Sequence, residues 1–516
     1  MRRRSHWAWG YADEEPGPAD IAAAAELMGA VTGFDLDGEI EAPVPLDAVR
    51  LRPPRVAPPP LPFCTTEPYE RISHTYGQAY RDLVRAFRGR FDDPPDVVAR
   101  PGDEHDLIRV LEWAENTGVA VIPYGGGTSV VGGVEPRGLG PSVSLDLTRL
   151  DRVLEVDEVS LAARVQAGML GPDLDRHLGG HGLTLRHFPQ SYELSTLGGW
   201  IATRAGGHFA TLATHIDDLV ESIRALTPRG VWESRRVPGS GAGVSPDRML
   251  LGSEGVLGVI TEAWVRVRPR PAHRASAAVR FPSFERAAEA VRAISQSGLH
   301  PANCRLLDPA EARLTSGGDG TYALLMLGFE SADHPVDAWM DRGLELVRAH
   351  GGTWDEVRSG GGGQGGAWKD AFLRMPYLRN AYPAIGLVAE TFETAVTWDR
   401  FAAFHTAVIG AVRDALGGEG IVTCRFAFTY PDGPAPYFTV LAPARRGDEL
   451  AQWDGIKRAA GEAILAAGGT ITHHHAVGRD HRPWYDRQRP DPFAAALRGA
   501  KAAVDPAAIL NPGVLV

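Results

Sequence analysis

The stretch Pro123-Tyr-Gly-Gly-Gly-Thr-Ser-Val-Val-Gly-Gly-Val134 joins two segments that the pattern of side chains predicts as strands. Residues 119–122 form an apolar, β-branched run, and residues 142–147 alternate between polar and apolar side chains. Glycine lets a backbone N–H group approach a ligand closely, and consecutive N–H groups can form a nest for an anion. The stretch therefore predicts a loop that holds a diphosphate. A flexible surface loop is the alternative, because a glycine-rich loop alone is weak evidence.

The stretch differs from two familiar phosphate-binding loops. A nucleoside-triphosphate loop would continue to a lysine, and Val130 and Val131 stand in that part of this sequence. The loop of a dinucleotide-binding fold leads from a strand into a helix, whereas a second predicted strand follows here. The identity of the ligand must therefore come from other segments of the chain.

Length and composition exclude several classes of protein. A chain of 516 residues is too long for one hydrophobic core, so we expect two or three domains. The net charge of -11 argues against a general nucleic-acid binder. Cys64, Cys304 and Cys424 show neither metal-binding nor disulfide spacing, and no apolar run predicts a signal peptide or a membrane span. A cytoplasmic protein is the simplest interpretation, since free thiols are typical of a reducing compartment.

The segments before the glycine-rich stretch predict an irregular start followed by an α+β unit. The predicted elements are a helix at 22–28, a stiff proline-rich connector at 53–62, a helix within 76–90, a strand at 96–100 and a helix at 101–117. Asp103 is a candidate N-cap of the last helix. The glycine-rich stretch would lie at the working edge of this unit.

Three more loops rich in glycine and hydroxyl residues follow, at 189–199, 203–208 and 252–258. The third leads into a predicted strand at 259–267. Each loop is polar and lies between apolar segments. Four such loops predict a single large ligand wrapped by backbone, with a set of unrelated turns as the alternative.

The composition changes at 269–271, which we interpret as a domain boundary. Strands and helices are then predicted in alternation, at 277–281, 284–296, 322–329, 337–349 and 385–390, followed by strands around 424–428 and 437–441 and a helix at 451–467. This order is typical of an antiparallel sheet with helices on one face. The glycine run at 360–366 predicts a loop.

With these loops in hand, the chain resembles the vanillyl-alcohol-oxidase, or PCMH-type, FAD-binding flavoprotein superfamily, and within it the alkyldihydroxyacetonephosphate synthases. The resemblance runs nearly from end to end. The matching motifs are Trp7-Ala-Trp-Gly-Tyr11, the loop at 123–129, residues 193–204, 216–220 and 252–262, Cys304-Arg-Leu-Leu-Asp308, residues 390–394 and Thr472-His-His-His-Ala-Val-Gly478. The chain departs from the family at Gln190, where we expect an acidic residue, and it ends in Leu515-Val516 without a peroxisomal targeting signal.

The resemblance implies an α+β fold, in which a two-part PCMH-type FAD-binding domain is joined to a cap domain with an antiparallel sheet and helices. We expect an N-terminal extension with a helical segment at 1–92 and the FAD-binding domain at 93–271. The cap or substrate domain would occupy 272–423. A C-terminal segment, 424–516, would complete the cap and the active site.

FAD is the cofactor that the resemblance implies. It should be non-covalent, because the glycine-rich stretch holds no His or Cys as an attachment point. Gly126 is expected to be glycine because backbone must approach phosphate there. The expected cofactor-binding residues are Pro123, Tyr124, Gly125, Gly126, Gly127, Thr128, Ser129, Gln190, Ser191, Ser195, Thr196, Thr203, Arg204, Ala205, Gly206, Glu254, Gly255, Val256, Leu257, Gly258, Val259 and Ile260.

His473, His474 and His475 are the first candidate catalytic group. On a strand, His473 and His475 would share one face and His474 would lie on the other. Three adjacent imidazoles could bind a metal, handle the substrate beside the flavin, or form a polar strand. The neighbouring residues supply no carboxylate to complete a metal site. We therefore favour substrate handling and expect no metal.

Tyr430 and Tyr437 bound the run Tyr430-Pro-Asp-Gly-Pro-Ala-Pro-Tyr437. Flavin-dependent 2-hydroxy-acid dehydrogenases that this fold resembles carry metal-binding histidines at the two ends of this run. A phenol replaces an imidazole poorly as a ligand of a divalent metal. The resemblance implies that Tyr437 is the acid/base residue, and the alternative is a buried tyrosine with a satisfied hydroxyl group.

Arg305 and Arg379 are the candidate substrate-binding residues. Guanidinium groups bind phosphate in a bidentate manner, and the family's phosphate-contacting arginine matches Arg379. Either residue alone would more often be a surface charge.

The resemblance implies an enzyme that exchanges the acyl chain of acyl-dihydroxyacetone phosphate for a fatty alcohol, without net redox change, in ether lipid synthesis. One alternative is an FAD-dependent oxidase or dehydrogenase of an alcohol or hydroxy acid. Another is a non-catalytic flavin- or lipid-binding protein. The expected partners are small-molecule lipid substrates and a second copy of the chain in a homodimer, with no nucleic acid, and peripheral contact with a membrane is a further expectation.

Overall fold

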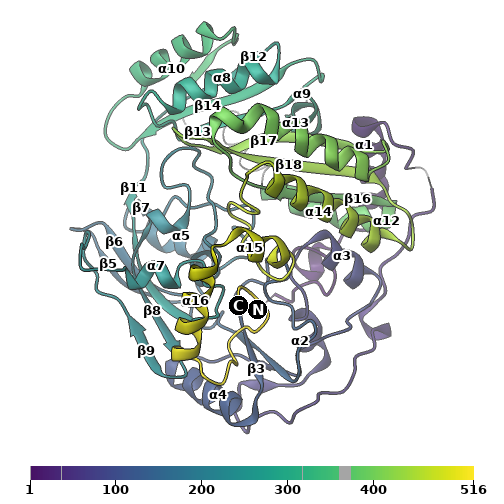
Figure 1. Ribbon diagram of the computed structural model, residues 1–516, viewed down its shortest axis with the longest axis vertical. Helices are drawn as coiled ribbons and strands as arrows, with labels where there is room; N and C mark the ends of the chain where they lie inside the picture. Colours follow the sequence, from purple (N-terminus) through teal and green to yellow (C-terminus); the bar gives the residue numbers. More distant parts are fainter. Residues whose placement is uncertain (1, 37, 317, 360–372) are drawn as a thin grey trace.

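A seven-stranded sheet lies at one end of the molecule and smaller sheets lie at the other (Figure 1). The computed structural model describes residues 2–36, 38–316, 318–359 and 373–516, so the loop predicted at 360–366 lies outside the described residues. Within the described part of the chain, no helix is both long enough and apolar enough to cross a bilayer.

The glycine-rich stretch follows the edge strand of a small, mostly parallel sheet. Strand β3 (Ala120–Tyr124) and strand β2 (Val97–Ala99) both pair in parallel with β4 (Ser142–Asp146), and β1 (Cys64–Thr65) adds an antiparallel edge. Helix α4 (Glu104–Thr117) connects β2 to β3, as parallel pairing requires. The loop therefore begins after Tyr124.

Helix α4 forms where the sequence pattern predicts it. The side chain of Asp103 accepts a hydrogen bond from the backbone N–H of Asp106, which makes it the predicted N-cap. The apolar residues at helical spacing face the sheet and are buried: Leu107, Val110, Leu111 and Ala114. Helix α4 and the two strands on either side of the loop, β3 and β4, are thus fixed by one small hydrophobic core.

A five-stranded antiparallel sheet completes this end of the molecule. Its order is β5 (Val153–Asp157), β6 (Ala162–Gln166), β10 (Val259–Arg266), β8 (Val220–Thr227) and β9 (Gly230–Glu233). The sequence pattern predicts only β10, because the outer strands β5 and β9 are largely exposed and lack an apolar pattern. Helices α5 (Gly171–Gly179), α6 (Leu197–Thr203) and α7 (Pro246–Leu250) and the β7–β11 pair (Leu183–Thr184, Arg268–Pro269) complete this region.

The seven-stranded sheet is antiparallel throughout. Its order is β15 (Val357–Ser359), β12 (His273–Phe281), β14 (Ala323–Ser331), β13 (Asn303–Leu307), β17 (Ile421–Thr429), β18 (Pro434–Pro443) and β16 (Leu387–Glu393). The helices that cover it are α8 (Phe284–Ser295), α10 (Asp337–Ala349), α13 (Trp398–Ala415) and α14 (Glu449–Ala466).

Alternation along the strands gives this sheet two different faces. Cys424, Phe426 and Phe438 pack in one hydrophobic core with the covering helices. Successive side chains of a strand point to opposite faces, so Arg425 and Tyr437 lie on the other face. We call this second face, which carries Arg305, Thr391, Arg425, Ala427 and Tyr437, the inner face.

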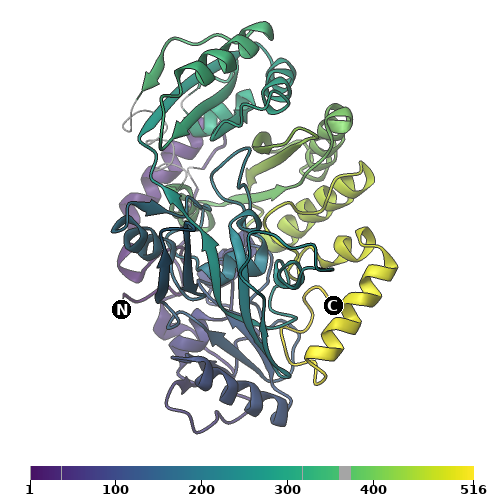
Figure 2. The ribbon, with the colours of Figure 1, turned by 90° about the vertical axis from the view of Figure 1, so that its left-hand side faces the viewer.

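Both ends of the chain contact both ends of the molecule. Helices α1 (Pro18–Thr32) and α3 (Tyr80–Phe87) pack with the seven-stranded sheet's core, whereas β1 belongs to the small sheet. The last segment runs through α15 (Arg482–Gln488) and α16 (Asp491–Val504) to β3, where the backbone of Val121 bonds with Ile509 and Asn511. The termini overlap in Figure 1 but lie on opposite sides in Figure 2.

The four-part division of the chain stays a prediction. The expected boundary between 423 and 424 falls inside β17, since that strand spans Ile421–Thr429. Residues beyond 424 also reach the glycine-rich loop's sheet, through the contacts of Val121. The C-terminal segment therefore contributes to both ends of the molecule.

Candidate active site

One cavity extends from the glycine-rich loop to the inner face of the seven-stranded sheet. The wall nearest the small sheet is made by residues 123–130, by parts of 189–207 and by Glu254, Gly255, Gly258 and Ile260. Arg305, Thr391, Arg425, Ala427, Phe428 and Tyr437 form the opposite wall, and His474 and His475 lie between the two. Residues that are far apart in the sequence thus meet around one space.

Gly126 packs so closely on a neighbouring loop that no side chain fits there. A Cβ at Gly126 would lie 1.7 Å from the backbone oxygen of Leu194, and one at Gly125 would lie 2.2 Å from Oγ1 of Thr196. Gly127 has a φ of +66°, which side chains other than hydrogen rarely tolerate. Gly125 and Gly126 therefore allow close contact between two loops, and approach of the Gly126 backbone to a phosphate stays a prediction.

The hydroxyl groups of Ser195 and Thr196, in the loop at 189–199, and of Thr203 hold helix α6 in place. Oγ1 of Thr196 accepts from the backbone N–H of Gly199 at 3.3 Å, and Thr203 donates to the backbone oxygen of Gly199 at 2.8 Å. Oγ of Ser195 accepts from the indole Nε1 of Trp200 at 2.7 Å. These residues therefore fix the shape of the cavity wall.

Four of the predicted cofactor-binding residues lie outside the cavity wall, and all the others line it. Arg204 ends helix α6 with a φ of 53°; its side chain is 57% exposed and donates to Asp217 at 2.7 Å. Val256, Leu257 and Val259 are buried in the hydrophobic cores. A sequence motif does not distinguish the residues that line the cavity from those that are buried in a hydrophobic core.

Glu254 connects the loop at 252–258 to the segment after the histidines. Its carboxylate accepts from the backbone N–H groups of Val477 at 2.9 Å and Gly478 at 2.8 Å. Burial raises the pKa of Glu254 to about 7, and those two donors partly offset the effect. The side-chain amide of Asn511 donates to the backbone oxygen of Glu254 at 2.7 Å, so three distant segments meet here.

A row of polar side chains crosses three adjacent strands at the inner face. Strand register places Arg425 opposite Tyr437, and Tyr437 opposite Glu393. The guanidinium carbon of Arg425 lies 3.9 Å from the centre of the Tyr437 ring. Arg305 on β13 lines the same cavity.

Arg305 and Arg425 are buried and keep their charge at neutral pH. Burial, and then the charge of Arg425, lowers the pKa of Arg305 to about 9. Burial also disfavours the charge on Arg425, but the adjacent Glu311 outweighs it and raises the pKa of Arg425. The inner face is therefore an electropositive wall that suits a phosphate or a phenolate.

The three histidines lie in a loop, so the alternation expected on a strand does not apply. His474 and His475 line the cavity, and their ring centres lie 6.1 and 5.5 Å from that of Tyr437. His473 is not part of the cavity wall, and its Nε2 lies 2.9 Å from the hydroxyl of Tyr430. The structure thus brings two of the three predicted histidines to the site.

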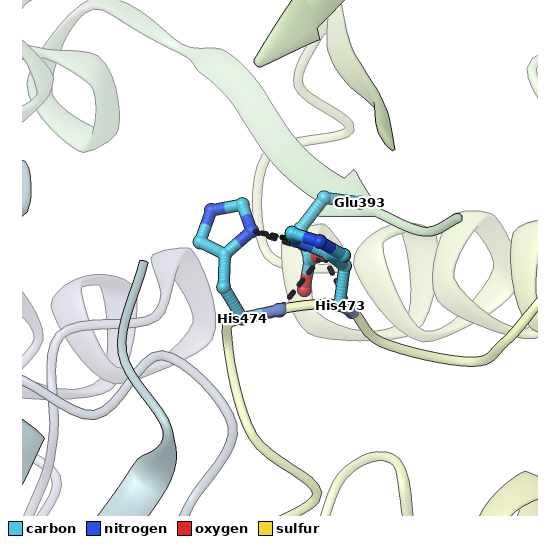
Figure 3. Close-up of side chains that lie close together, drawn as sticks. All are labelled: Glu393, His473 and His474. Carbon is cyan, nitrogen blue, oxygen red and sulfur yellow. Dashed lines mark hydrogen bonds and ion pairs between the residues drawn. The ribbon is translucent and has the colours of Figure 1, made fainter. Parts of the chain in front are cut away.

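Glu393 holds the histidine loop in shape (Figure 3). One carboxylate oxygen accepts from Thr472 Oγ1 at 2.6 Å and from the backbone of His475 at 2.9 Å. The other accepts from the backbone of His473 at 2.6 Å and of His474 at 3.1 Å. The residues next to the histidines in the sequence supply no carboxylate, but the fold brings one to them, from Glu393, 80 residues before His473.

The charges of this cluster follow from its burial. Burial opposes ionisation of Glu393, yet the adjacent His474 outweighs it and holds the pKa of Glu393 well below its usual range. Burial lowers the pKa of His473 and of His475 well below the usual value, so both are neutral at neutral pH. Atoms of Glu393, His473 and His474 lie within 4.8 Å of one another, as in a metal site, but both oxygens of Glu393 are already occupied by protein donors.

Tyr430 and Tyr437 have different surroundings although only seven positions separate them. The hydroxyl of Tyr430 lies 2.9 Å from both His473 Nε2 and Thr214 Oγ1. Burial raises the pKa of Tyr430 above its usual value. Tyr437 lines the cavity beneath Arg425 instead. The proton-transfer role thus fits Tyr437, and Tyr430 serves to orient His473.

Arg379 lines the cavity where the cap meets the glycine-rich loop. Its Nη2 donates to the backbone oxygen of Gln78 at 3.3 Å, and the N–H of Gln78 donates to the backbone oxygen of Ser129 at 2.6 Å. The next residue, Asn380, bonds with both backbone groups of Trp9, at 2.8 and 3.0 Å. Arg379 is thus fixed at the contact between the N-terminal segment, the cap and the cofactor loop.

Sequence reasoning missed several residues of the site. Arg425 and Glu393 had a usable signal, since both are charged residues within strands of mostly buried side chains. Trp9, Gln78 and Asn511 also line the cavity. These three lie in loops, and no periodic pattern marks them.

Known families match this arrangement. Residues 95–234 match a model of the FAD binding domain, and residues 270–515 match a model of the C-terminal domain of FAD linked oxidases. Alkyldihydroxyacetonephosphate synthase of Trypanosoma brucei brucei is 32% identical over 480 residues, covering 87% of this chain and 77% of that protein. The chain belongs to the alkyldihydroxyacetonephosphate synthase family. The family's protein from Dictyostelium discoideum is 30% identical over 476 residues, covering 86% of this chain and 77% of that one.

A solved structure of an alkyldihydroxyacetonephosphate synthase has the same fold. It superposes with a TM-score of 0.82 at 26% sequence identity, and the match covers 98% of each chain. With the two family models, this likeness confirms the predicted α+β architecture and FAD as the cofactor. The synthase family's cofactor suits the cavity, because Gly125, Gly126 and Gly127 present backbone without side chains to its wall.

Replacing Gly126 by alanine should abolish FAD binding. The added Cβ would overlap the backbone oxygen of Leu194, so the two loops must separate. Acid precipitation measures the effect, because it should release intact, non-covalent FAD from the wild-type protein and little or none from the variant.

Gly140→Ala is the matched control. A Cβ at Gly140 meets no atom within 4 Å, so this variant should keep its flavin. Full flavin content in Gly126→Ala would contradict the role given to the loop contact. Flavin that stays with the precipitated wild-type protein would contradict non-covalent binding.

Replacing Glu393 by alanine should destabilise the protein by about 3 kcal/mol or more, because four buried donors lose a charged acceptor. The pKa of Glu393 is lowered in the folded state, so its contribution exists above the ordinary glutamate pKa and disappears as the pH falls through the folded value. Urea unfolding at neutral and acidic pH measures both effects. An unchanged free energy of unfolding at neutral pH would show that the loop does not depend on Glu393.

Proposed function

We propose that this chain exchanges the acyl chain of acyl-dihydroxyacetone phosphate for a fatty alcohol, the reaction that its family's name describes. The family membership supports the chemistry. The observation that carries the proposal is the position of Tyr437 under Arg425, in the same cavity as His474 and the cofactor loop. A phosphorylated substrate at this wall would meet a proton-transfer group and cations together.

Each residue of the cavity has a separate task. Bound FAD supplies the reactive centre beside which the C1 carbon must lie. Tyr437 removes and returns the C1 proton, since a phenol in an electropositive wall can ionise. His474 and His475 line the cavity and can assist the departing and arriving oxygens by hydrogen bonding. Arg379 and Arg305 hold the phosphate group.

An FAD-dependent oxidase or dehydrogenase is the second candidate. The match of residues 270–515 to the C-terminal domain of FAD linked oxidases favours it. It predicts that an alcohol or a hydroxy acid bleaches the flavin, and that oxygen or a dye restores the colour. The exchange reaction predicts no net bleaching.

Purified protein incubated with acyl-dihydroxyacetone phosphate and labelled hexadecanol should yield a labelled ether lipid. Tyr437→Phe should keep FAD and its melting temperature but lower turnover by about 100- to 10,000-fold, the usual contribution of a general acid–base group. Product formation by mass spectrometry is the measurement. Flavin bleaching by hydroxy acids without any ether product would establish the oxidoreductase instead.

Tyr382→Phe is the control for loss of a buried hydroxyl group. The hydroxyl of Tyr382 donates to the sulfur of Met28, and Tyr382 does not line the cavity. This variant should keep full turnover. If Tyr437→Phe is equally active, the phenol does not move the proton and the histidines must do so.

The exchange should proceed without a divalent metal. Glu393 already accepts hydrogen bonds on both oxygens, and Tyr430 and Tyr437 stand where related dehydrogenases carry histidines. Turnover should therefore be unchanged after dialysis against a chelator. Loss of turnover that zinc or manganese restores would return Glu393, His473 and His474 to a metal site.

Lipid substrates also motivate the predicted partners. We propose peripheral contact with a membrane, because both the acyl chain and the fatty alcohol partition into bilayers. A homodimer is proposed from the family resemblance, and a cytoplasmic location from the free thiols of Cys64, Cys304 and Cys424.

A further inference from the structure

Arg425 lies over Tyr437 in the cavity wall, apart from the role in phosphate binding proposed for Arg379 and Arg305. The central carbon of its guanidinium group lies over the ring of Tyr437, 3.9 Å from the ring centre. The two residues are direct partners in the β17–β18 register, so the strands fix their separation. Both side chains are buried and both line the cavity.

A residue of a neighbouring helix, Glu311, pairs with Arg425 on strand β17. Nη1 of Arg425 and Oγ1 of Thr423 donate to the two oxygens of Glu311, on helix α9 (Pro309–Ser316). The side chain of Glu311 is only 2% exposed. Asp308 fastens the same helix to the strand, because it accepts from the backbone of Glu311 at 2.7 Å and of Cys424 at 2.6 Å. The guanidinium therefore cannot turn away from the ring.

Several charged and ionisable groups surround Tyr437 on the inner face. Arg425 faces it from β17 and Arg305 from β13, and the rings of His474 and His475 face it from the C-terminal loop. Two carboxylates oppose them. That of Glu393, opposite Tyr437 on β16, is engaged by four donors of the histidine loop, and that of Glu311 lies behind Arg425. A cation on the face of the ring is thus the nearest charge.

We propose that Arg425 is a positioning residue for proton transfer, which stabilises the phenolate of Tyr437, and that Glu311 sets the strength of this effect. The inference rests on the proposed function. When the phenolate oxygen takes the C1 proton, the O–H bond forms as the C–H bond breaks, and the electron pair stays on the substrate carbon. Arg425 balances the phenolate charge before that step and is not itself altered.

The two charged residues should move the pH profile in opposite directions. Arg425→Gln removes the cation, so the phenolate is less stable and the acid limb of kcat/KM moves to higher pH. Opposite charges within about 4–6 Å shift an ionisation by about 1–3 pH units, so a move of about one unit is expected. Glu311→Gln can still accept from Arg425 and Thr423, but it leaves the cation less neutralised, so the limb moves to lower pH.

The chain contains a matched control for the loss of such an arginine. Arg85 also lies 3.9 Å over a tyrosine ring, that of Tyr76, and pairs with the buried Glu135. Neither Arg85 nor Tyr76 lines the cavity. Arg85→Gln should lower the melting temperature and leave the acid limb in place. Arg425→Lys, which keeps the charge, should restore most of the wild-type profile.

The measurements are kcat/KM for ether formation against pH, flavin content and thermal melting, for the wild-type protein and the four variants. Opposite shifts in Arg425→Gln and Glu311→Gln support the proposal. Lower melting temperatures with the wild-type pH profile in both variants would falsify it, and would leave Arg425 as a structural ion pair. If Arg425→Gln does not fold, the direction of the Glu311→Gln shift decides alone.

Failure of the proposed function gives a different result. In that case the wild-type protein forms no ether lipid at any pH. A wild-type protein that forms product, an inactive Tyr437→Phe and an unshifted Arg425→Gln would overturn only the role of Arg425.

Discussion

The absence of a side chain at Gly126 is the constraint on which the cavity depends. Because its backbone lies against that of Leu194, the glycine-rich loop and the second loop form one wall. From this wall a line of buried contacts leads to the cap. Glu254 binds the backbone after the histidines, Glu393 binds the backbone of the histidines themselves, and strand pairing then continues to Tyr437. The cavity wall nearest the small sheet and the opposite wall on the inner face are thus one connected structure.

Local patterns in the sequence predict much of the fold. The helix at 104–117 with its Asp103 cap, the loop between two strands and the antiparallel cap sheet all follow from periodicity and capping residues. The exposed strands β5 and β9 escape this reasoning, because an edge strand need not carry an apolar pattern. Arg204 shows the opposite limit, since a matching motif cannot tell that a left-handed residue turns its side chain outward.

The pairing of distant residues is what the sequence cannot supply. Periodicity indicates that Arg425 lies on the face opposite Phe426, but only the register of β17 with β18 places it beneath the cavity and over Tyr437. Glu393 illustrates the same point, because its donors lie in a loop that is distant in the sequence. Both residues carry charge into a buried strand, which costs free energy unless a partner is present. Such residues are therefore the ones for which a distant partner should be sought.

The two tyrosines at the ends of one short run show how surroundings divide similar groups between different tasks. Tyr430 is partly buried, and its hydroxyl hydrogen-bonds with His473 and Thr214. Burial disfavours its ionisation, so it can hold a proton firmly and orient His473 away from the cavity. Tyr437 lies in the cavity wall beneath the guanidinium of Arg425, which Glu311 fixes in place. The strand register that separates these two environments thereby also decides which phenol can exchange a proton with a ligand.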